Sequence, residues 1–412
     1  MKLAAVDTIK SEIPPLPDFI ETLKDILKAK STHPVMIDGG GRVLKGIEVY
    51  ASLWALGAGL VPVAEQAEEL GERIPLEALD YYRSLTKNPG RVFESVAELA
   101  EKDAPTPLVR LKSLSKNGAR VWAKLEWYHP FSLSIKDRVA SAMISHALKK
   151  GLLKHPRLFE PTSTNTGLGL VGLGNFYGLK TRIYLPSTAQ RCVDYLFAAM
   201  GAEVSRRSVP LTTQLIREVI EDAGREGAVV LNQFENDLNL IAHLRGTAKE
   251  LDYQVKIKGL KPSLIVSGMG TSGHISALSL YFKNMYGGVK VYGVQPSQGS
   301  FIPGLRRVET GMKWIKYAEL DGVLDVSLEE ALEGVIQVSR SDGILLGLSA
   351  GAAAQALSKL IDEGGVEGDA ILIVPDHGVK YIELLETILA RPCINGSGEN
   401  AESKIRNIPL KA

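Results

Sequence analysis

The stretch Phe131-Ser-Leu-Ser134-Ile-Lys136-Asp137-Arg138 joins a serine-rich loop to the start of a predicted helix. A predicted strand at 120–127 precedes it, and apolar residues at helical spacing follow it. Ser134 and Asp137 have the spacing of a capping box, so the helix should begin here, with Lys136 on its first turn. A lysine buried in such a place can have a lowered pKa and form a Schiff base. On this stretch alone, a solvated lysine beside a helix cap is the commoner arrangement.

From about residue 105, apolar runs alternate with helical periods. Strands are predicted at 121–125, 158–160, 181–185, 203–206, 229–232, 264–267, 289–294, 344–346 and 371–374. Helices are predicted at 136–150, 166–177, 190–200, 212–224, 238–254, 273–284, 328–341, 350–363 and 381–389. This alternation predicts an α/β fold with mostly parallel sheet covered on both faces. Ligands of such sheets bind beyond the carboxyl ends of the strands.

The two ends of the chain differ from this pattern. Residues 1–95 lack the alternation and contain predicted helices at 18–28, 46–60 and 75–85. We expect an N-terminal, mainly helical extension that packs on a core of residues 96–392. The final stretch, 393–412, is a polar tail that we expect to be poorly ordered.

Composition excludes several classes of function. The net charge of +1 gives no electrostatic footprint for nucleic acid or an acidic membrane. The two cysteines imply no disulfide framework, and neither they nor the seven histidines have metal-ligand spacing. The first residues lack the apolar core of a signal peptide. We therefore expect a cytoplasmic protein without a metal site.

Two glycine-rich loops, 167–172 and 268–273, match G-x-G-x-x-G. Neither is followed about 20 residues later by the acid that a dinucleotide site needs, and neither has a P-loop lysine. The second loop follows a predicted strand and opens a helix, so its backbone N–H groups favour an anion such as phosphate. The alternative is that these glycines only allow close packing of helix and strand.

Other loops add polar groups at the same edge. Residues 160–167 offer more hydroxyls than one helix cap needs, which indicates a small polar ligand such as a carboxylate. Gln233 ends a predicted strand, and the turn 347–351 opens another helix. Arg306 and Arg307 follow a Pro-Gly pair and are either a phosphate clamp or two solvated arginines.

Together, these loops resemble the fold-type II pyridoxal-phosphate enzymes of the cysteine synthase and cystathionine β-synthase family. The motifs that carry the resemblance occur in family order: Ser134-Ile-Lys136-Asp-Arg138, Glu160-Pro-Thr-Ser-Thr-Asn-Thr-Gly167, Gly268-Met-Gly270-Thr-Ser-Gly273 and Gly347-Leu-Ser349-Ala-Gly351. Segments 125–134, 232–237, 295–299 and 302–311 are most similar to the archaeal O-phosphoserine sulfhydrylases of this family. The resemblance covers residues 105–390 and implies a tryptophan synthase β-like fold. In this fold a small lobe, about 130–245, faces a large lobe, about 96–129 plus 246–392.

The resemblance also implies roles for individual residues. Lys136 would carry pyridoxal 5′-phosphate as a Schiff base, Asn165 would bond its phenolate oxygen, and Ser349 would meet its pyridine nitrogen. The implied phosphate cradle consists of Gly268, Gly270, Thr271, Ser272, Gly273 and His274. The implied grip on the substrate carboxylate consists of Thr162, Ser163, Thr164 and Gln233. Arg306 matches the position that binds the substrate phosphate.

The implied reaction is β-replacement through an α-aminoacrylate, making L-cysteine from O-phospho-L-serine and sulfide, with O-acetylserine as a second donor. Thr164 replaces a glycine of the common family loop, and Ser272 and His274 depart from the usual phosphate loop, which leaves substrate choice open. Alternatives are condensation of serine with homocysteine, a serine or threonine dehydratase, and a non-catalytic paralogue that binds the cofactor. The family also implies a homodimer.

Overall fold

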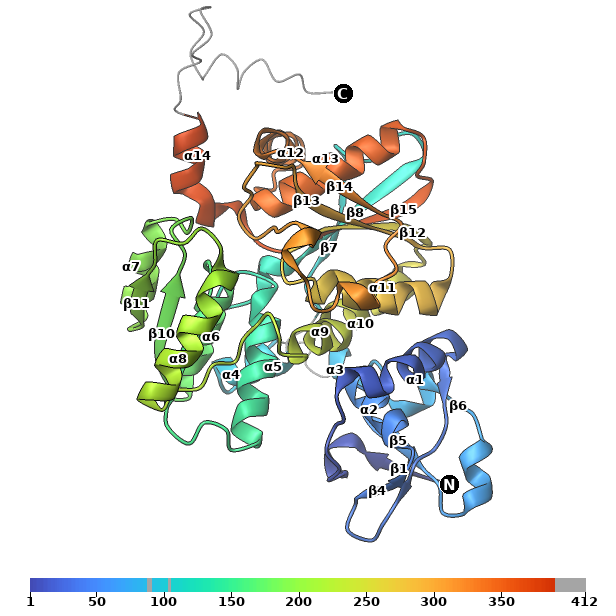
Figure 1. The fold of residues 1–412 in the computed structure, drawn as a ribbon. Helices are drawn as coiled ribbons and strands as arrows, with labels where there is room; N and C mark the ends of the chain where they lie inside the picture. Colours follow the sequence, from blue (N-terminus) through green and yellow to red (C-terminus); the bar gives the residue numbers. More distant parts are fainter. Residues whose placement is uncertain (87–90, 103–104, 390–412) are drawn as a thin grey trace, which may run out of the picture.

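The computed structural model describes residues 1–86, 91–102 and 105–389, and two sheets organise residues 108–374 (Figure 1). The predicted tail, 393–412, lies outside the described residues. No helix within the described ranges is long and apolar enough to cross a membrane.

The larger sheet has six strands in the order β14-β13-β12-β15-β8-β7. Their bounds are β7 Leu108–Leu111, β8 Ala119–Leu125, β12 Pro262–Gly268, β13 Lys290–Pro296, β14 Gly322–Val326 and β15 Gly368–Val374. All neighbours are parallel except β7 and β8. Because successive strand residues point to opposite faces, Leu264 and Val266 pack with α12 (Leu328–Asp342) and α13 (Leu348–Asp362), whereas Ile265 packs with α11 (Gly273–Tyr286). Both faces are therefore buried, as the apolar runs predict.

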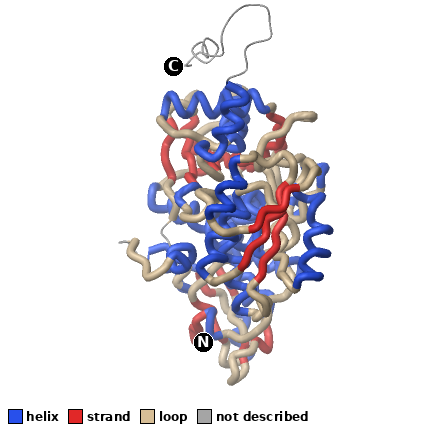
Figure 2. Tube along the Cα trace, turned by 90° about the vertical axis from the view of Figure 1, so that its left-hand side faces the viewer, coloured by secondary structure: helices blue, strands red, loops and turns tan. Residues whose placement is uncertain are grey.

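The smaller sheet has three parallel strands, β9 (Arg157–Pro161), β10 (Lys180–Leu185) and β11 (Glu203–Arg206), with β10 in the centre. Helices α6 (Asn165–Phe176) and α7 (Cys192–Ala199) pack on one face, and α8 (Ile216–Glu226) packs on the other. Figure 2 shows this sheet from its own side of the molecule, flanked by helices.

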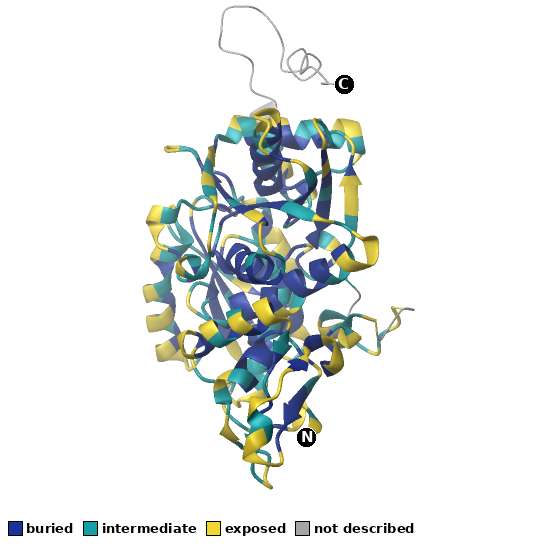
Figure 3. Cartoon of the chain, turned by 90° about the vertical axis from the view of Figure 1, so that its right-hand side faces the viewer, coloured by how far each residue is buried: buried dark blue, intermediate teal, exposed yellow. Residues whose placement is uncertain are grey.

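Helices between the two sheets connect them. They are α5 (Lys136–Lys149), α9 (Leu238–His243), a π-helical turn at Leu244–Ala248 and α10 (Lys249–Lys258). Helix α5 contacts α6 and α9, and α9 contacts α11, so the small and large sheets share one continuous apolar core. Figure 3 shows these buried residues in the interior and the exposed ones on the outside.

The N-terminal extension is only partly as predicted. It contains α1 (Leu16–Ala29) and α2 (Ile47–Ala55), but also antiparallel pairs of short strands. These pairs are β1 (Lys2–Ala5) with β5 (Leu60–Val63), β2 (Ser31–Thr32) with β6 (Ile74–Pro75), and β3 (Met36–Ile37) with β4 (Val43–Lys45). The predicted helix 46–60 ends early because the chain turns at Gly57, with φ +66°, to enter β5. The predicted helix 75–85 is interrupted at Asp80, whose φ is +53°. The boundary at residue 95 remains a prediction.

Two predicted strands of the core are also wrong. Residues 229–232 and 344–346 make only single bridges, at Val229 and Leu346. Asn232, the last residue of the first segment, has a left-handed backbone with φ +53°, and Gly343, directly before the second segment, has φ +74°. Neither segment can therefore be extended at that end. Strands β7 and β14, which were not predicted, lie at the two edges of the larger sheet.

Candidate active site

Lys136 is the first residue of α5, where the sequence predicts the helix to begin. The predicted capping box is wrong: the Asp137 carboxylate accepts from the backbone N–H groups of Phe131, at 2.7 Å, and Ser132, at 3.0 Å. Ser134 forms an isolated antiparallel bridge with Asp376, and its hydroxyl lies 2.7 Å from that of Ser132. The Ser134 hydroxyl instead accepts from the N–H of Lys136 at 3.2 Å. Hydrogen bonds from the loop to Asp137 and from Lys136 to the loop therefore fix the start of α5.

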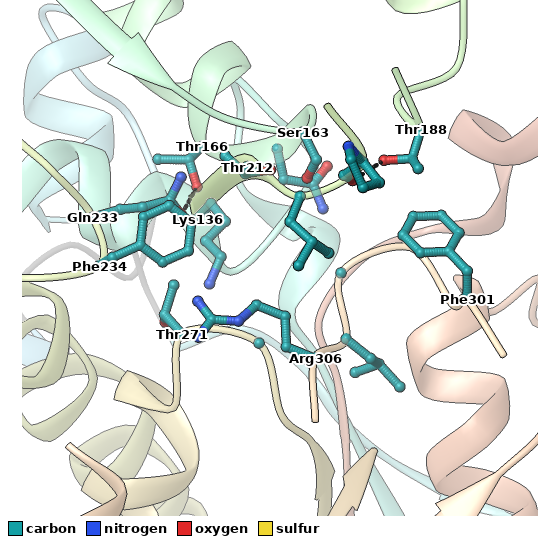
Figure 4. Close-up of a pocket in the computed structure, with 16 residues that line it drawn as sticks. Lys136, Ser163, Thr166, Thr188, Thr212, Gln233, Phe234, Thr271, Phe301 and Arg306 are labelled. Carbon is teal, nitrogen blue, oxygen red and sulfur yellow. Dashed lines mark hydrogen bonds between the residues drawn. The ribbon is translucent and has the colours of Figure 1, made fainter. Parts of the chain in front are cut away.

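The Lys136 side chain projects into a pocket between the two sheets, between the Thr166–Gln233 pair and Arg306 (Figure 4). Removal from water lowers the pKa of Lys136 to about 8, although Asp376 opposes this shift. The pocket is lined by Lys136, Ser163, Asn165, Thr166, Thr188, Pro210, Leu211, Thr212, Gln233, Phe234, Gly270, Thr271, Phe301, Gly304, Leu305 and Arg306. The loops 160–167 and 268–273 and the segments with Gln233 and Arg306 thus converge on Lys136, whereas the turn 347–351 contributes no lining residue.

The hydroxyl-rich loop follows β9 and opens α6. Ser163 and Asn165 line the pocket, whereas Thr162 is buried and its hydroxyl accepts from the N–H of Gly167 at 3.2 Å. Thr164 precedes the helix, and its hydroxyl donates to the carbonyl of Ser163. Thr162 and Thr164 therefore shape the loop without lining the pocket.

Hydrogen bonds to both its side chain and its backbone hold Gln233 in place. Its side-chain oxygen accepts from the Thr166 hydroxyl at 2.6 Å, and its backbone N–H donates to the Glu160 carboxylate at 2.9 Å. Asn239 donates to the Gln233 carbonyl at 2.7 Å and to the Thr271 hydroxyl at 3.1 Å. Burial raises the pKa of Glu160 to about 7. Asn239 thereby joins the segment at Gln233 to the glycine-rich loop.

The glycine-rich loop follows β12 and opens α11. Its glycines are needed for packing, because a Cβ at Gly270 would lie 2.5 Å from the Gly304 carbonyl oxygen, and one at Gly273 would lie 2.1 Å from Asn239 Oδ1. Ser272 is left-handed, with φ +72°, and its buried hydroxyl has no hydrogen-bond partner among the described residues. Packing thus explains the glycines, but an unsatisfied hydroxyl at a helix N-terminus still favours an anionic ligand.

His274 and Ser349 lie behind the pocket lining. The His274 Nε2 atom is 2.7 Å from the Ser267 hydroxyl, and burial lowers the pKa of His274 to about 3. Its imidazole is therefore neutral and paired with Ser267, and His274 is not among the residues that line the pocket. Ser349 is buried on the first turn of α13, beside Gly268.

The structure separates the two candidate arginines. Arg306 lines the pocket, its guanidinium lies 5.3 Å from the centre of the Phe234 ring, and Thr310 and Gly311 orient it. No carboxylate within the described part of the chain pairs with Arg306, and burial lowers its pKa. Arg307 instead pairs with Asp325 at 2.9 Å and with Glu309 at 3.0 Å.

Sequence reasoning missed several residues at the site. Asp376 follows β15 and accepts from the Asn165 amide at 2.8 Å, and the ammonium of Lys380 donates to the Asn165 side-chain oxygen. A polar residue after a predicted strand was a signal for Asp376, but nothing in the sequence pointed to Lys380. The lining residues Thr188, Leu211 and Phe301 lie on loops without a motif, and Thr212 begins a short 3-10 helix. Phe234 lies in the segment 232–237, which was noted for the resemblance but was given no role.

These features fit pyridoxal 5′-phosphate. The unsatisfied Ser272 hydroxyl and the N-terminus of α11 suit its phosphate, the amide of Asn165 suits its phenolate oxygen, and Lys136 suits its aldehyde carbon. When bound, this cofactor withdraws electrons from the α carbon of an amino acid. Within the described ranges, no group of three His, Cys, Asp or Glu side chains could hold a metal ion.

The comparisons with known proteins agree with this chemistry. Residues 99–376 match the family described as "Pyridoxal-phosphate dependent enzyme". Cysteine synthase B of Pseudomonas aeruginosa is 35% identical over 285 residues, which cover 67% of this chain and 93% of that protein. Cystathionine beta-synthase of Saccharomyces cerevisiae is 31% identical over 67% of this chain and 60% of that protein.

A solved structure shows the same fold. The structure of cysteine synthase from Entamoeba histolytica matches with a TM-score of 0.61 and 26% identity, over 79% of this chain and 97% of that one. The predicted α/β fold and the predicted cofactor are confirmed. This chain belongs to the pyridoxal-phosphate dependent enzyme family and is a pyridoxal-phosphate enzyme of the cysteine synthase type.

Proposed function

We propose that this protein is an O-phosphoserine sulfhydrylase, which makes L-cysteine from O-phospho-L-serine and sulfide. The observation that carries the proposal is Arg306, a guanidinium on the same pocket as Lys136 that has no carboxylate partner among the described residues. A half-buried cation without a carboxylate partner favours a dianionic phosphate over an uncharged acetyl ester.

Each group of residues has a role in this proposal. The amine of Lys136 binds the cofactor, then removes the proton from the substrate α carbon and later returns it. Ser163 and Gln233, supported by Thr162 and Thr164, bind the substrate carboxylate. Arg306 binds the substrate phosphate, which leaves as inorganic phosphate when the bond between the β carbon and oxygen breaks. Sulfide then adds at that carbon.

The roles at the cofactor follow the resemblance. Asn165 would donate to its phenolate oxygen, and Gly268, Gly270, Thr271, Ser272, Gly273 and the backbone of His274 would hold its phosphate. Ser349 is a neutral partner for the pyridine nitrogen. A neutral partner leaves the ring less positive than a carboxylate would, which favours prompt loss of the leaving group over transamination.

The experiment that tests this proposal compares Arg306→Ala with Arg307→Ala on two substrates. We expect Arg306→Ala to lower kcat/KM for O-phosphoserine by about 100-fold, the equivalent of about 2.7 kcal/mol, because it removes a charge-assisted contact to phosphate. Its kcat/KM for O-acetylserine should fall less than about threefold. Arg307→Ala is the matched control and should change neither value. Equal losses on both substrates in Arg306→Ala would contradict the phosphate-binding role.

A second candidate is condensation of serine with homocysteine, which the similarity to cystathionine beta-synthase supports. It predicts cystathionine from serine and homocysteine, and no use of Arg306. Formation of pyruvate or 2-oxobutyrate would instead identify a dehydratase. A homodimer in the cytoplasm is proposed on the resemblance alone.

A further inference from the structure

The side chain of Asn165 is held by two charged groups that come from the far end of the chain. Its Nδ2 atom donates to Asp376 Oδ2 at 2.8 Å, and its oxygen accepts from the ammonium of Lys380. Asp376 follows β15, and Lys380 lies on the next helical turn, Gly378–Tyr381. They are 211 and 215 residues away from Asn165 in the sequence.

Both charged groups are withdrawn from solvent. The Lys380 side chain is 8% exposed and that of Asp376 is 1% exposed, and the two lie 3.3 Å apart. Tyr381 also donates to Asp376 Oδ2, at 2.5 Å. A buried pair of this kind costs desolvation energy, and a hydrophobic pair of the same volume often gives equal stability. Its presence beside the cofactor site therefore suggests a role other than stability.

The charges determine which way the Asn165 amide faces. An amide can rotate to exchange its oxygen and nitrogen, but a cation accepts no hydrogen bond and a carboxylate donates none. The oxygen of Asn165 must therefore face Lys380, and the nitrogen must face Asp376. Asp376 accepts one of the two hydrogens on that nitrogen, and a ligand in the pocket that Asn165 lines competes with the Tyr381 hydroxyl for the other.

Lys380 also holds the loop that carries Lys136. Its ammonium donates to the backbone carbonyls of Ser132, at 2.8 Å, and Leu133, at 3.3 Å. Leu133 is left-handed, with φ +48°, so this loop has a backbone conformation that its own residues do not favour. The ammonium of Lys380 thus connects the loop before Lys136 with the loop that carries Asn165.

We propose that Lys380 and Asp376 are positioning residues, which fix the Asn165 amide so that one N–H donates to the phenolate oxygen of the cofactor. The inference rests on the proposed role of Asn165 at the cofactor and extends it to two residues that do not themselves line the pocket. It concerns cofactor binding, which precedes any choice of substrate.

The test is a double-mutant cycle between Lys380→Met and Asn165→Ala, measured on the purified full-length protein. The cofactor affinity of each apo-protein is measured by titration with pyridoxal 5′-phosphate, and the absorption maximum of each holoprotein is recorded. We expect Lys380→Met to weaken cofactor affinity about tenfold and to shift the visible absorption maximum, as loss of a charge-assisted hydrogen bond predicts. In the Asn165→Ala background the same substitution should change affinity less than about twofold and leave the maximum unchanged.

Two further variants keep the test decisive. Lys359→Met removes a lysine that pairs with Glu330 on the surface of α13 and should change neither quantity. Asp376→Asn takes the place of Lys380→Met in the cycle if the latter does not fold, with the same expectation. Equal losses of affinity in both backgrounds, or an unchanged absorption maximum in Lys380→Met, would overturn the proposal.

The outcome is separate from that of the substrate assay. A protein that shows the expected coupling but makes no cysteine keeps the positioning role and loses the proposed function. A protein that makes cysteine from O-phosphoserine but shows no coupling keeps the function and loses the positioning role.

Discussion

Substitution of Glu250 by glutamine should be among the most destabilising single-atom changes in this protein. Glu250 belongs to a buried network with Lys124, Glu126 and Arg138, whose two cations and two anions balance. Its carboxylate accepts from two nitrogens of Arg138, both at 2.7 Å, and from Lys124 at 3.1 Å. All four side chains are at most 9% exposed.

The magnitude follows from the charges left behind. Removing one partner of a buried ion pair typically costs about 3–5 kcal/mol, because the other charge stays buried without compensation. Glutamine keeps the volume and one acceptor oxygen, so we expect the lower end, about 3 kcal/mol. At about 2 °C per kcal/mol for a large domain, the melting temperature should fall by about 6 °C.

The assay is thermal unfolding of the apo-protein at a fixed scan rate, with two comparison variants. Glu221→Gln breaks the exposed pair between Arg217 and Glu221, and should cost at most about 0.5 kcal/mol. Lys124→Met combined with Glu250→Gln removes one charge of each sign and should recover about half of the loss. A Glu250→Gln variant no less stable than Glu221→Gln would refute the reasoning.

Three further predictions concern acid, base and packing. The neighbouring cations hold the pKa values of Glu126 and Glu250 below their usual range, with that of Glu250 at about 2. The stability that this network contributes should therefore be present above pH 4.5 and be lost as the pH falls from 4.5 towards 2. Glu250→Gln should flatten that part of the curve, and an unchanged acid limb would contradict the assignment. Because the pKa of Lys136 is lowered to about 8, cofactor capture by the apo-protein should rise with pH to a midpoint near 8, and a midpoint near the ordinary value of 10.5 would show a solvated amine. Gly347→Ala should destabilise the protein by at least about 2 kcal/mol, because a Cβ there would lie 1.9 Å from Asp376 Oδ1. Gly224 lies on a helix with open space around it, so Gly224→Ala should raise the free energy of unfolding by about 0.5–1 kcal/mol. Similar melting temperatures for the two variants would be inconsistent with this packing.

The sequence predicts the central strands well because they are buried on both faces. The centres of β12 and β15, at 264–266 and 370–374, are apolar without interruption, which is typical of parallel sheet between two helix layers. The edge strands β7 and β14 were missed because they have only four and five residues and each contains a single buried residue, which leaves no apolar run. The short strands of the N-terminal extension carry even less signal, since several have only two or three residues.

The candidate site could be predicted only as far as single loops. Lys136, Asn165 and Gly270 each lie where a strand or loop passes into a helix, so local spacing was enough to select them. Their long-range partners were not accessible, because Lys380 is 215 residues away from the amide that it holds. Local spacing does not distinguish Arg306 from Arg307. The resemblance selects Arg306, and the tertiary structure adds that Arg307 pairs with Asp325 and Glu309.

The most direct test of the proposed function is to identify the products of the purified holoprotein. Cysteine, cystathionine, pyruvate and inorganic phosphate are measured after incubation with O-phosphoserine and sulfide, with O-acetylserine and sulfide, and with serine and homocysteine. We predict cysteine and phosphate in equal amounts from O-phosphoserine, at a higher kcat/KM than from O-acetylserine. Cystathionine from serine and homocysteine, with no phosphate released from O-phosphoserine, would contradict the account.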